Sequence, residues 1–351
     1  MPVFSQIPPG YYSTVTGSGY ILKSQLKTII TNGHTDRGYS ALYNAYTTTD
    51  TDTFYENDHT VLDMYSENPA GPDPYNYIHN DRNCGNYNSE NDCYNREHIF
   101  PQGFFNEQFP MRSDIHHVVP SDGFVNNRRA NYPFGEISTP TWTSSNGSKV
   151  GPNTYDTYTG VVFEPIDEFK GDIARMLLYF ATRYEDDVTH SSWDTHTTVN
   201  NPLNGTNDQI YEDWYIRLLH KWHTEDPVSQ REITRNNEAY TFQGNRNPYI
   251  DHPEYVSMIW GSVLAVDYYT QLKKVVISPN PSPTNSITLT ISEGLHIDSV
   301  AIYSVPGKQI YKNTLPGFTN NKLTITNLKS GIYVLRLLSN KQSVSKKIII
   351  E

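Results

Sequence analysis

A glutamate and a histidine stand side by side in the segment CYNREHIFP, as Glu97 and His98. Successive side chains of a β-strand point to opposite faces, so two such neighbours are expected to do different work. A carboxylate is a ligand for hard cations such as Mg²⁺, and a neutral imidazole can take a proton from water. We therefore expect Glu97 to bind a metal ion and His98 to act as a general base.

The segment RSDIHHVVPSDGFVNNRRANYPFGE, residues 112–136, is predicted to complete this site. Its DIHHVVP portion alternates like a strand and ends at Pro120, and Ser121 is the expected N-cap of a short helix. If the two strands and the helix pack as one ββα unit, the Glu-His pair faces the amides and guanidinium groups of residues 126–129. Base, metal ion and phosphate-binding cation would then share one cleft, which is what phosphodiester hydrolysis needs.

Together the two segments resemble the bacterial endonuclease I family, a group of ββα-metal nucleases. The resemblance continues through FEPIDEFKGDIARMLLYFATRYE and WHTEDPVSQREITRNNEAYTFQGNRNPYIDHPEYVSMIW and covers nearly all of residues 1–265. It implies that His98 is the general base and that Glu97 binds magnesium together with Asn126, with Mn²⁺ and Ca²⁺ as the other cations considered. Asn127 is the alternative ligand if the side chain of Asn126 points away.

The arginine that stabilises the cleaved phosphate in that family has no secure counterpart here. Arg129 is assigned this catalytic role, and Arg112 is the alternative. Arg96, Arg112 and Arg128 are expected to contact the substrate, although Arg96 could equally be an exposed charge on the strand.

The charge balance limits how the chain could handle a polyanion. The net charge is −11, and the residues from 275 onward hold eight basic and three acidic side chains, which leaves −16 for the rest. Long-range attraction of phosphates is therefore excluded as the main means of binding a polyanionic substrate. A nuclease of this composition would depend on a bound cation and a local cluster of arginines.

Two further residue pairs near the site could hold a metal ion or form a crosslink. The side chains of His116 and His117 should diverge on a strand, so we favour a structural role for His116 over a zinc site. Many members of the family have Asn in place of His117, whose role stays open. Cys84 and Cys93 bracket the polar loop GNYNSEND without partners at zinc-finger spacing. A local disulfide, which suits an exported protein, is favoured over two unrelated thiols.

The composition changes near Lys273 and divides the chain into two predicted domains. Residues 1–272 contain helical spacing, as in DEFKGDIARMLLYFATRYE, separated by long polar loops. Residues 273–351 contain short alternating β-branched runs between Pro, Gly and Asn turns, which is typical of a small β-sandwich. We predict an α+β fold, with a mainly helical nuclease domain that embeds a ββα-metal motif, followed by a small β-sandwich.

The runs ISPNPSPTNSITL, VAIYSVPGKQIY, LKSGIYVLRL and SVSKKIII resemble the C-terminal sorting domain of type IX secretion. The resemblance implies an export signal that the type IX secretion machinery reads, and no catalysis. Met1 leads into PVFSQIPPGYY without a basic and apolar leader, so the chain is either cytoplasmic or has lost its leader, and its composition favours the second. We expect a monomeric protein without a membrane span, secreted or held at the outer-membrane surface.

These observations favour a secreted, magnesium-dependent endonuclease with little sequence preference. It would cut DNA, with RNA left open, to products with a 5′-phosphate. One alternative is a non-catalytic secreted module that binds nucleic acid or a surface, and another is a metal-dependent phosphodiesterase for small substrates. The combination of Glu97, His98 and Asn126 disfavours the binding module, because a pure binder does not need a base beside a metal ligand.

Three other polar stretches are given structural interpretations. Lys170, Asp172 and Arg175 are expected to form an internal ion-pair network. The stretch QGNRNPYIDHP, residues 243–253, is expected to be a loop held by side chain–backbone hydrogen bonds. TTTDTDTFYEND, residues 47–58, is acidic enough to bind calcium but lacks the EF-hand pattern, so no calcium site is expected there.

Overall fold

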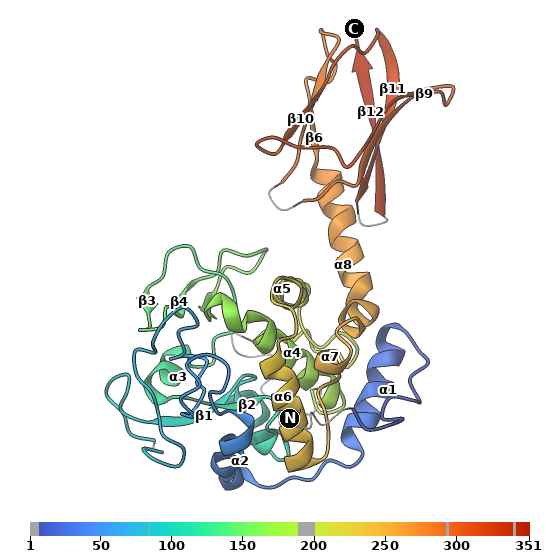
Figure 1. Cartoon of the computed structure of the whole chain (residues 1–351). Coiled ribbons are helices and arrows are strands. Elements are labelled where there is room, and N and C mark those ends of the chain that lie inside the picture. The colour runs from blue at the N-terminus through green and yellow to red at the C-terminus, as the bar shows by residue number, and fades with distance from the viewer. Residues whose placement is uncertain (1–6, 84, 189–200, 293–294, 340–341) are drawn as a thin grey trace. The chain divides into compact units, whose positions relative to one another are not determined.

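The computed structural model describes residues 7–83, 85–188, 201–292, 295–339 and 342–351, without the side chains of 264–268 (Figure 1). The chain forms two compact units, Met1–Trp260 and Gly261–Glu351. Helices prevail in the first and strands in the second, which confirms the predicted mixture of helix and sheet. The division after Trp260 lies twelve residues before the boundary that composition predicts, and α8 (Tyr255–Lys274) runs through both positions.

Seven helices of the first unit precede α8 in the described residues. They are α1 (Gly19–Thr31), α2 (Leu42–Thr49), α3 (Gly123–Arg129), α4 (Lys170–Arg183), α5 (Asp213–Glu225), α6 (Gln230–Gln243) and α7 (Pro248–Asp251). α4 contacts α1, α5 and α7 and is buried along nearly its whole length. Its apolar residues at spacings of three and four, Ile173, Met176, Leu177 and Phe180, therefore pack inside the unit rather than on a solvent-facing helix.

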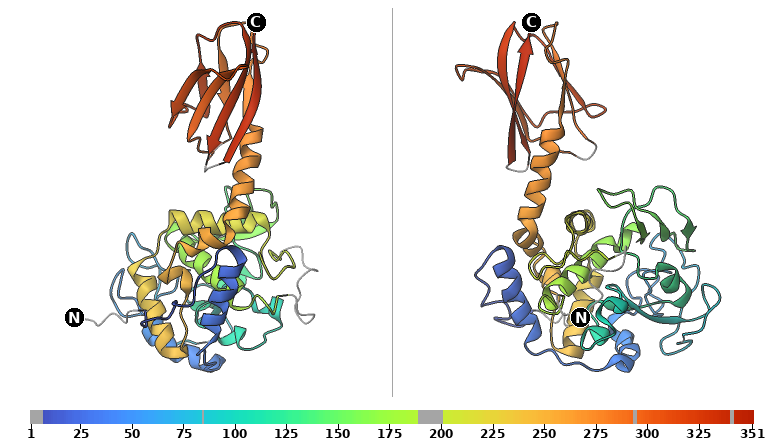
Figure 2. Two further views of the ribbon diagram at one scale, coloured as in Figure 1. Left: turned by 90° about the vertical axis from the view of Figure 1, so that its right-hand side faces the viewer. Right: turned by 180° about the vertical axis from the view of Figure 1, so that it is seen from behind.

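Two small sheets complete the first unit. β1 (Tyr94–His98) pairs antiparallel with β2 (Val118–Asp122), and α3 follows β2 directly and contacts both strands. β3 (Trp142–Thr143), β4 (Lys149–Pro152) and β5 (Val161–Glu164) form the other sheet. α1 lies at one end of this unit, and β3 and β4 lie at the other (Figures 1 and 2).

The predicted limits of the second strand and of the helix were wrong. β2 begins at Val118, and Asp114 to His117 form a turn, with His117 and Val118 both donating to the Asp114 carbonyl. Pro120 lies inside β2 opposite Arg96, where a two-stranded sheet tolerates its missing N–H. The N-cap is Asp122 instead of Ser121, because the Asp122 carboxylate accepts the Val125 amide at 2.9 Å.

The second unit is built from two antiparallel sheets around one apolar core. One sheet has the order β10-β7-β6 and the other β12-β11-β8-β9. Their strands are β6 (Val276–Ser278), β7 (Ile287–Thr290), β8 (Ser299–Ser304), β9 (Gln309–Thr314), β10 (Lys322–Ile325), β11 (Gly331–Ser339) and β12 (Gln342–Ile350). Leu289 of one sheet and Leu335 of the other belong to the same buried cluster, as does Leu272 from α8. This is the arrangement of a β-sandwich.

Of the three polar stretches that were given structural interpretations, the ion-pair network and the loop before α7 have the expected roles. Arg175 is fully buried and pairs with Glu232 at 2.5 Å, and Arg231 pairs with Asp172. In the loop before α7, the side chain of Asn247 accepts the Tyr249 amide and donates to the Arg175 carbonyl. Within the described part of the chain, none of the helices is both long enough and apolar enough to span a membrane.

Candidate active site

A cavity of about 490 Å³ opens beside β1 and α3. Its lining is mostly polar and consists of Tyr39, Tyr43, Asn83, Gly85, Asn95, Arg96, Glu97, His98, Pro101, Gln102, Asn126, Arg129, Ala130 and Asn131. Glu97 and His98 both border it, although neighbours on a strand alternate in direction. The predicted base and both predicted metal ligands therefore meet at one cavity, and each has its own set of contacts.

Glu97 is only 1 % exposed and is held through one carboxylate oxygen. Its Oε1 accepts the Tyr65 hydroxyl at 2.9 Å and lies 3.5 Å from Nε of Arg129. The His98 main-chain N–H is a further donor to this carboxylate. Burial raises the pKa of Glu97, and the Arg129 charge and the Tyr65 hydrogen bond oppose that rise. A hard cation bound at this carboxylate would restore the ionised form, so the group fits a metal ligand.

The hydrogen bond of His98 identifies which ring nitrogen is basic. Nε2 lies 3.1 Å from the main-chain carbonyl of Arg112, which can only accept, so Nε2 carries the hydrogen and Nδ1 holds the lone pair. Burial, followed by the neighbouring His117, lowers the pKa of His98 to about 3. The ring is stacked near Tyr39, with centroids 5.7 Å apart. A neutral imidazole with a fixed tautomer can accept a proton at neutral pH.

Asn126 reaches the same cavity from α3, and Asn95 orients its amide. Nδ2 of Asn126 donates to Oδ1 of Asn95 at 2.7 Å, which leaves Oδ1 of Asn126 available as a metal ligand. Asn95 stands two positions before Glu97 on β1, so the two share a face of the strand. Asn127 is exposed and does not line the cavity, so the alternative ligand is turned away.

Arg129 is buried, and its guanidinium contacts both Glu97 and the main chain at the end of β1. Its guanidinium donates to the carbonyls of His98 at 3.1 Å and Ile99 at 2.7 Å, in addition to the ion pair with Glu97. It also stacks over Phe134 at 4.8 Å. These contacts make Arg129 a positioning residue for the end of β1, and its assigned contact with a cleaved phosphate stays a prediction.

The other three candidate arginines occupy different places. Arg96 lines the cavity, stacks over Tyr39 at 3.5 Å and donates to the Tyr39 carbonyl. Arg112 stacks on Tyr39 at 4.5 Å and pairs with Glu107 at 3.0 Å. Its main-chain carbonyl accepts the hydrogen bond from Nε2 of His98. Arg128 is exposed over Phe124 and does not border the cavity. The structure thus brings Arg96 to the site and leaves Arg128 apart from it.

His116 and His117 are both buried and hydrogen-bonded to main-chain carbonyls. Nε2 of His116 lies 3.0 Å from the Asn245 carbonyl, and Nε2 of His117 lies 2.7 Å from that of Met111. Burial lowers the pKa of each to about 4. Among the described side chains, neither belongs to a group of three metal-binding residues. The structural role predicted for His116 is confirmed, and His117 has a comparable one beside the His98 ring.

Sequence reasoning missed Tyr65, Tyr39 and Asn95. Tyr65 lies 32 positions before Glu97, which it contacts, and Tyr39 lies 59 positions before His98. No local sequence pattern indicates either contact. The i, i+2 spacing of Asn95 and Glu97 was the one usable signal. Cys93 is buried, but Cys84 lies outside the described residues, so the disulfide stays a prediction.

Comparisons with known proteins agree with the geometry. The family described as Endonuclease I matches residues 18–254, and the one described as Secretion system C-terminal sorting domain matches residues 276–351. An extracellular ribonuclease of Bacillus amyloliquefaciens is 34% identical over 257 residues, which cover 71% of this chain and 78% of the relative. An extracellular ribonuclease of Bacillus subtilis (strain 168) is 34% identical over 258 residues, with the same shares covered. Both resemblances seen in the sequence are confirmed.

Proposed function

This chain belongs to the endonuclease I family, and we propose that it is a secreted endonuclease that uses Mg²⁺ to hydrolyse phosphodiester bonds in nucleic acids. The observation that carries the proposal is the fixed tautomer of His98, which holds its lone pair on Nδ1 and lines the same cavity as Glu97 and Asn126. A base beside two oxygen ligands suits the activation of water at a phosphate.

The residues at the cavity fit a magnesium ion. Glu97 brings a carboxylate to the cavity, Asn126 brings an amide oxygen that its hydrogen bond to Asn95 leaves available, and Mg²⁺ prefers such hard ligands in small number. When bound, the ion would neutralise charge on the scissile phosphate and on the leaving oxygen. Mn²⁺ and Ca²⁺ have similar ligand preferences and are expected to compete for the same oxygens.

His98 takes the proton from the attacking water through Nδ1, and its Nε2–H stays bonded to the Arg112 carbonyl. The imidazolium that forms is stabilised by that carbonyl. Arg96 holds the phosphate at the rim of the cavity, while Arg129 keeps Glu97 in place and contacts the phosphate once its charge increases. Departure of the 3′ oxygen leaves a 5′-phosphate on the product.

We further propose that both DNA and RNA are substrates. Water is the nucleophile in this mechanism, so cleavage does not require a 2′-hydroxyl. The two Bacillus relatives are named extracellular ribonucleases, whereas the family bears the name of an endonuclease. Arg96 and Arg129 line the cavity, and their guanidinium groups suit contacts to the phosphates that DNA and RNA share.

The C-terminal unit is proposed to direct export through the type IX secretion machinery to the outside of the cell or to its surface. The match to a secretion sorting domain over residues 276–351 supports this role. None of the described residues that line the nuclease cavity comes from this unit. We therefore assign the tail no part in the chemistry.

The test is cleavage of supercoiled plasmid and of a structured RNA by the wild type and by His98→Ala, each with Mg²⁺ and with EDTA. We expect His98→Ala to lose about 10²–10⁴-fold in rate while it still binds DNA. His220→Ala is the matched control, since His220 lies on α5 outside the cavity. Cleavage at the wild-type rate by His98→Ala, or by the wild type in EDTA, would contradict the proposal.

A further inference from the structure

A compact loop closes on the carboxylate of Asp52, in the acidic stretch where no cation site was expected. Oδ1 accepts the amides of Phe54 and Tyr55, both at 3.0 Å, and Oδ2 accepts the amide of Asn57 at 2.9 Å. The carboxylate is therefore fixed in position while Oδ2 keeps a lone pair free. The loop carries Glu56, which is exposed, at its outer side.

Glu67 comes from a different segment, and the burial of its carboxylate is unusual. It is 1 % exposed, its Oε1 is buried without a hydrogen-bond partner, and no described residue donates a hydrogen bond to its carboxylate. Its main chain is held, since its amide donates to Asp63 and its carbonyl accepts the amide of Asn146. A buried carboxylate without a donor or a counter-ion is costly, and such a group is usually paired or bound to metal.

Among the described residues no cation forms an ion pair with Glu67, and the charge of Arg231 only partly offsets the rise in its pKa. The guanidinium of Arg231 is engaged by Asp172. Burial, and after it the carboxylates of Asp73, Glu56 and Asp52, raise the pKa of Glu67 to about 9. The carboxylates around Glu67 therefore repel its negative charge, and either a proton or a bound cation must relieve this repulsion.

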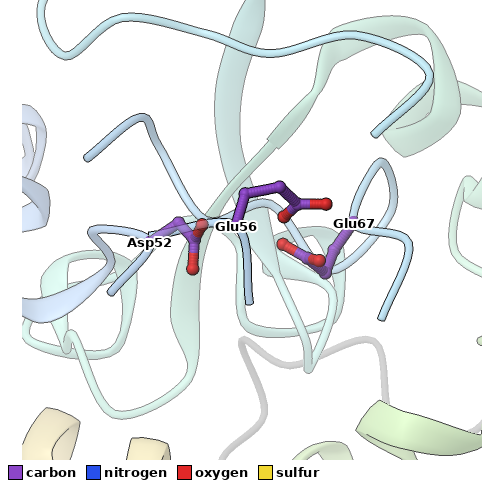
Figure 3. A group of neighbouring side chains, drawn as sticks. All are labelled: Asp52, Glu56 and Glu67. Carbon is purple, nitrogen blue, oxygen red and sulfur yellow. The ribbon is translucent and has the colours of Figure 1, made fainter. Parts of the chain in front are cut away.

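The geometry of the three carboxylates favours a cation. One oxygen each from Asp52, Glu56 and Glu67 lie within 4.8 Å of one another, and Figure 3 shows the three side chains gathered around one space. Ca²⁺ binds oxygens at about 2.3–2.6 Å, so two ligands on opposite sides of one ion are separated by roughly 5 Å. The exposed side of Glu56 leaves room for the water ligands that a coordination number of six to eight requires.

We propose that Asp52, Glu56 and Glu67 form a second cation site, which takes Ca²⁺ and is separate from the nuclease cavity. Asp52 supplies a ligand fixed by the loop, Glu67 a buried one and Glu56 an outer one. Three carboxylates spread over about 4.8 Å, with an exposed side open to water, suit Ca²⁺ better than Mg²⁺, which requires a tighter octahedron.

The ion would also connect this loop to the nuclease cavity. Two positions before Glu67, the hydroxyl of Tyr65 holds Oε1 of Glu97, and Asp63 at the start of the same segment accepts the Asp122 amide. Ca²⁺ on Glu67 would therefore fix the segment that orients the nuclease's own metal ligand. The site is structural, and its role is to keep residues 63–67 in place.

The test measures Ca²⁺ binding to full-length protein by isothermal titration calorimetry and by thermal unfolding with and without CaCl₂. All variants carry Glu97→Gln, which removes the carboxylate of the nuclease cavity. We expect this background to bind one Ca²⁺ and to melt at a higher temperature with it. Adding Glu67→Gln or Glu56→Gln should weaken binding by about tenfold or more and reduce the Ca²⁺-dependent rise in melting temperature.

Glu225→Gln, at an exposed position of α5, is the control for loss of one negative charge and should leave Ca²⁺ binding unchanged. If Glu67→Gln does not fold, Glu56→Gln decides, because that exposed side chain is not needed for packing. The proposal is overturned if the Glu97→Gln background binds no Ca²⁺, as a protonated Glu67 would predict. It is also overturned if Glu56→Gln binds as tightly as the background. Neither result bears on the proposed nuclease activity, since the background lacks that site's carboxylate.

Discussion

Replacing Tyr65 by Phe removes one hydroxyl group and leaves the rest of the cavity in place. That hydroxyl donates to Oε1 of Glu97 at 2.9 Å, inside the protein. The ring also packs against Phe163, with centroids 4.8 Å apart, and this contact remains in the variant. The change therefore isolates the hydrogen bond that orients the proposed metal ligand.

The expected magnitude follows from the kind of bond removed. A hydrogen bond to a charged acceptor contributes about 1.5–3 kcal/mol. Since about 1.4 kcal/mol corresponds to a factor of ten, the affinity for Mg²⁺ should fall by roughly 10–100-fold, as it does for other groups that support metal ligands. Arg129 remains 3.5 Å from the same oxygen and limits the loss, so we expect a value near the lower end.

The assay is the rate of plasmid cleavage as a function of Mg²⁺ concentration. Tyr65→Phe should raise the concentration for half-maximal rate by about tenfold or somewhat more, while the rate at saturating Mg²⁺ stays within a few-fold of the wild type. Tyr46→Phe is the matched control, because Tyr46 is fully buried and its hydroxyl has no hydrogen-bond partner among the described residues. It should leave both values unchanged.

Two results would refute the reasoning. One is an unchanged Mg²⁺ dependence in Tyr65→Phe, which would mean that Glu97 does not bind the ion or needs no help from the hydroxyl. The other is a large loss of rate at saturating Mg²⁺ with the same half-saturation, which would place Tyr65 in the chemical step.

Three further predictions concern pH, stability and the tail. Because the pKa of Glu97 is raised and that of His98 is lowered to about 3, the loss of activity on the acid side should come from Glu97. Protons and Mg²⁺ then compete, so higher Mg²⁺ should move this limb of the pH–rate profile to lower pH, and a limb insensitive to Mg²⁺ would point to His98 instead. Glu232→Gln removes the nearer carboxylate from the fully buried Arg175 and leaves Asp172, 4.0 Å away, as its remaining charged partner, so it should cost about 3 kcal/mol in urea unfolding. Glu225→Gln on the surface should cost less than about 0.5 kcal/mol. A chain that ends after Trp260 should keep its cleavage rate and the salt dependence of DNA binding; a flatter salt dependence would show that the tail holds DNA.

Much of the site was readable from the sequence because its chemistry is concentrated in two short segments. Glu97 and His98 are adjacent and Asn126 follows on a helix, so residue type and local spacing were enough to group them. The period of two in the tail predicted its strands for the same reason, since alternation is a local property of a half-buried strand. The spacing of α4 likewise identified its buried residues.

The segment before β2 shows where local pattern fails. Residues 114–117 alternate like a strand, but the buried carboxylate of Asp114 accepts hydrogen bonds from Tyr179, Tyr184 and Gln243, and these distant partners hold the segment as a turn. The N-cap of α3 is Asp122, one position after the predicted Ser121, and this difference is within the usual uncertainty of helix ends.

The features that decide how the site works come from contacts far apart in the chain. The Arg112 carbonyl selects the tautomer of His98, Tyr65 holds Glu97, and Glu67 meets Asp52 across a folded loop. Within the described residues, no helix or strand lies between α2 and β1, so no periodicity links residues 50–93 to the cavity. Residue types and their local order thus determined which chemistry was available. Only tertiary packing decided which nitrogen is the base, which side chains hold the metal ligands, and which carboxylate is left without a partner among the described residues, because those contacts depend on distances in space that sequence spacing does not encode.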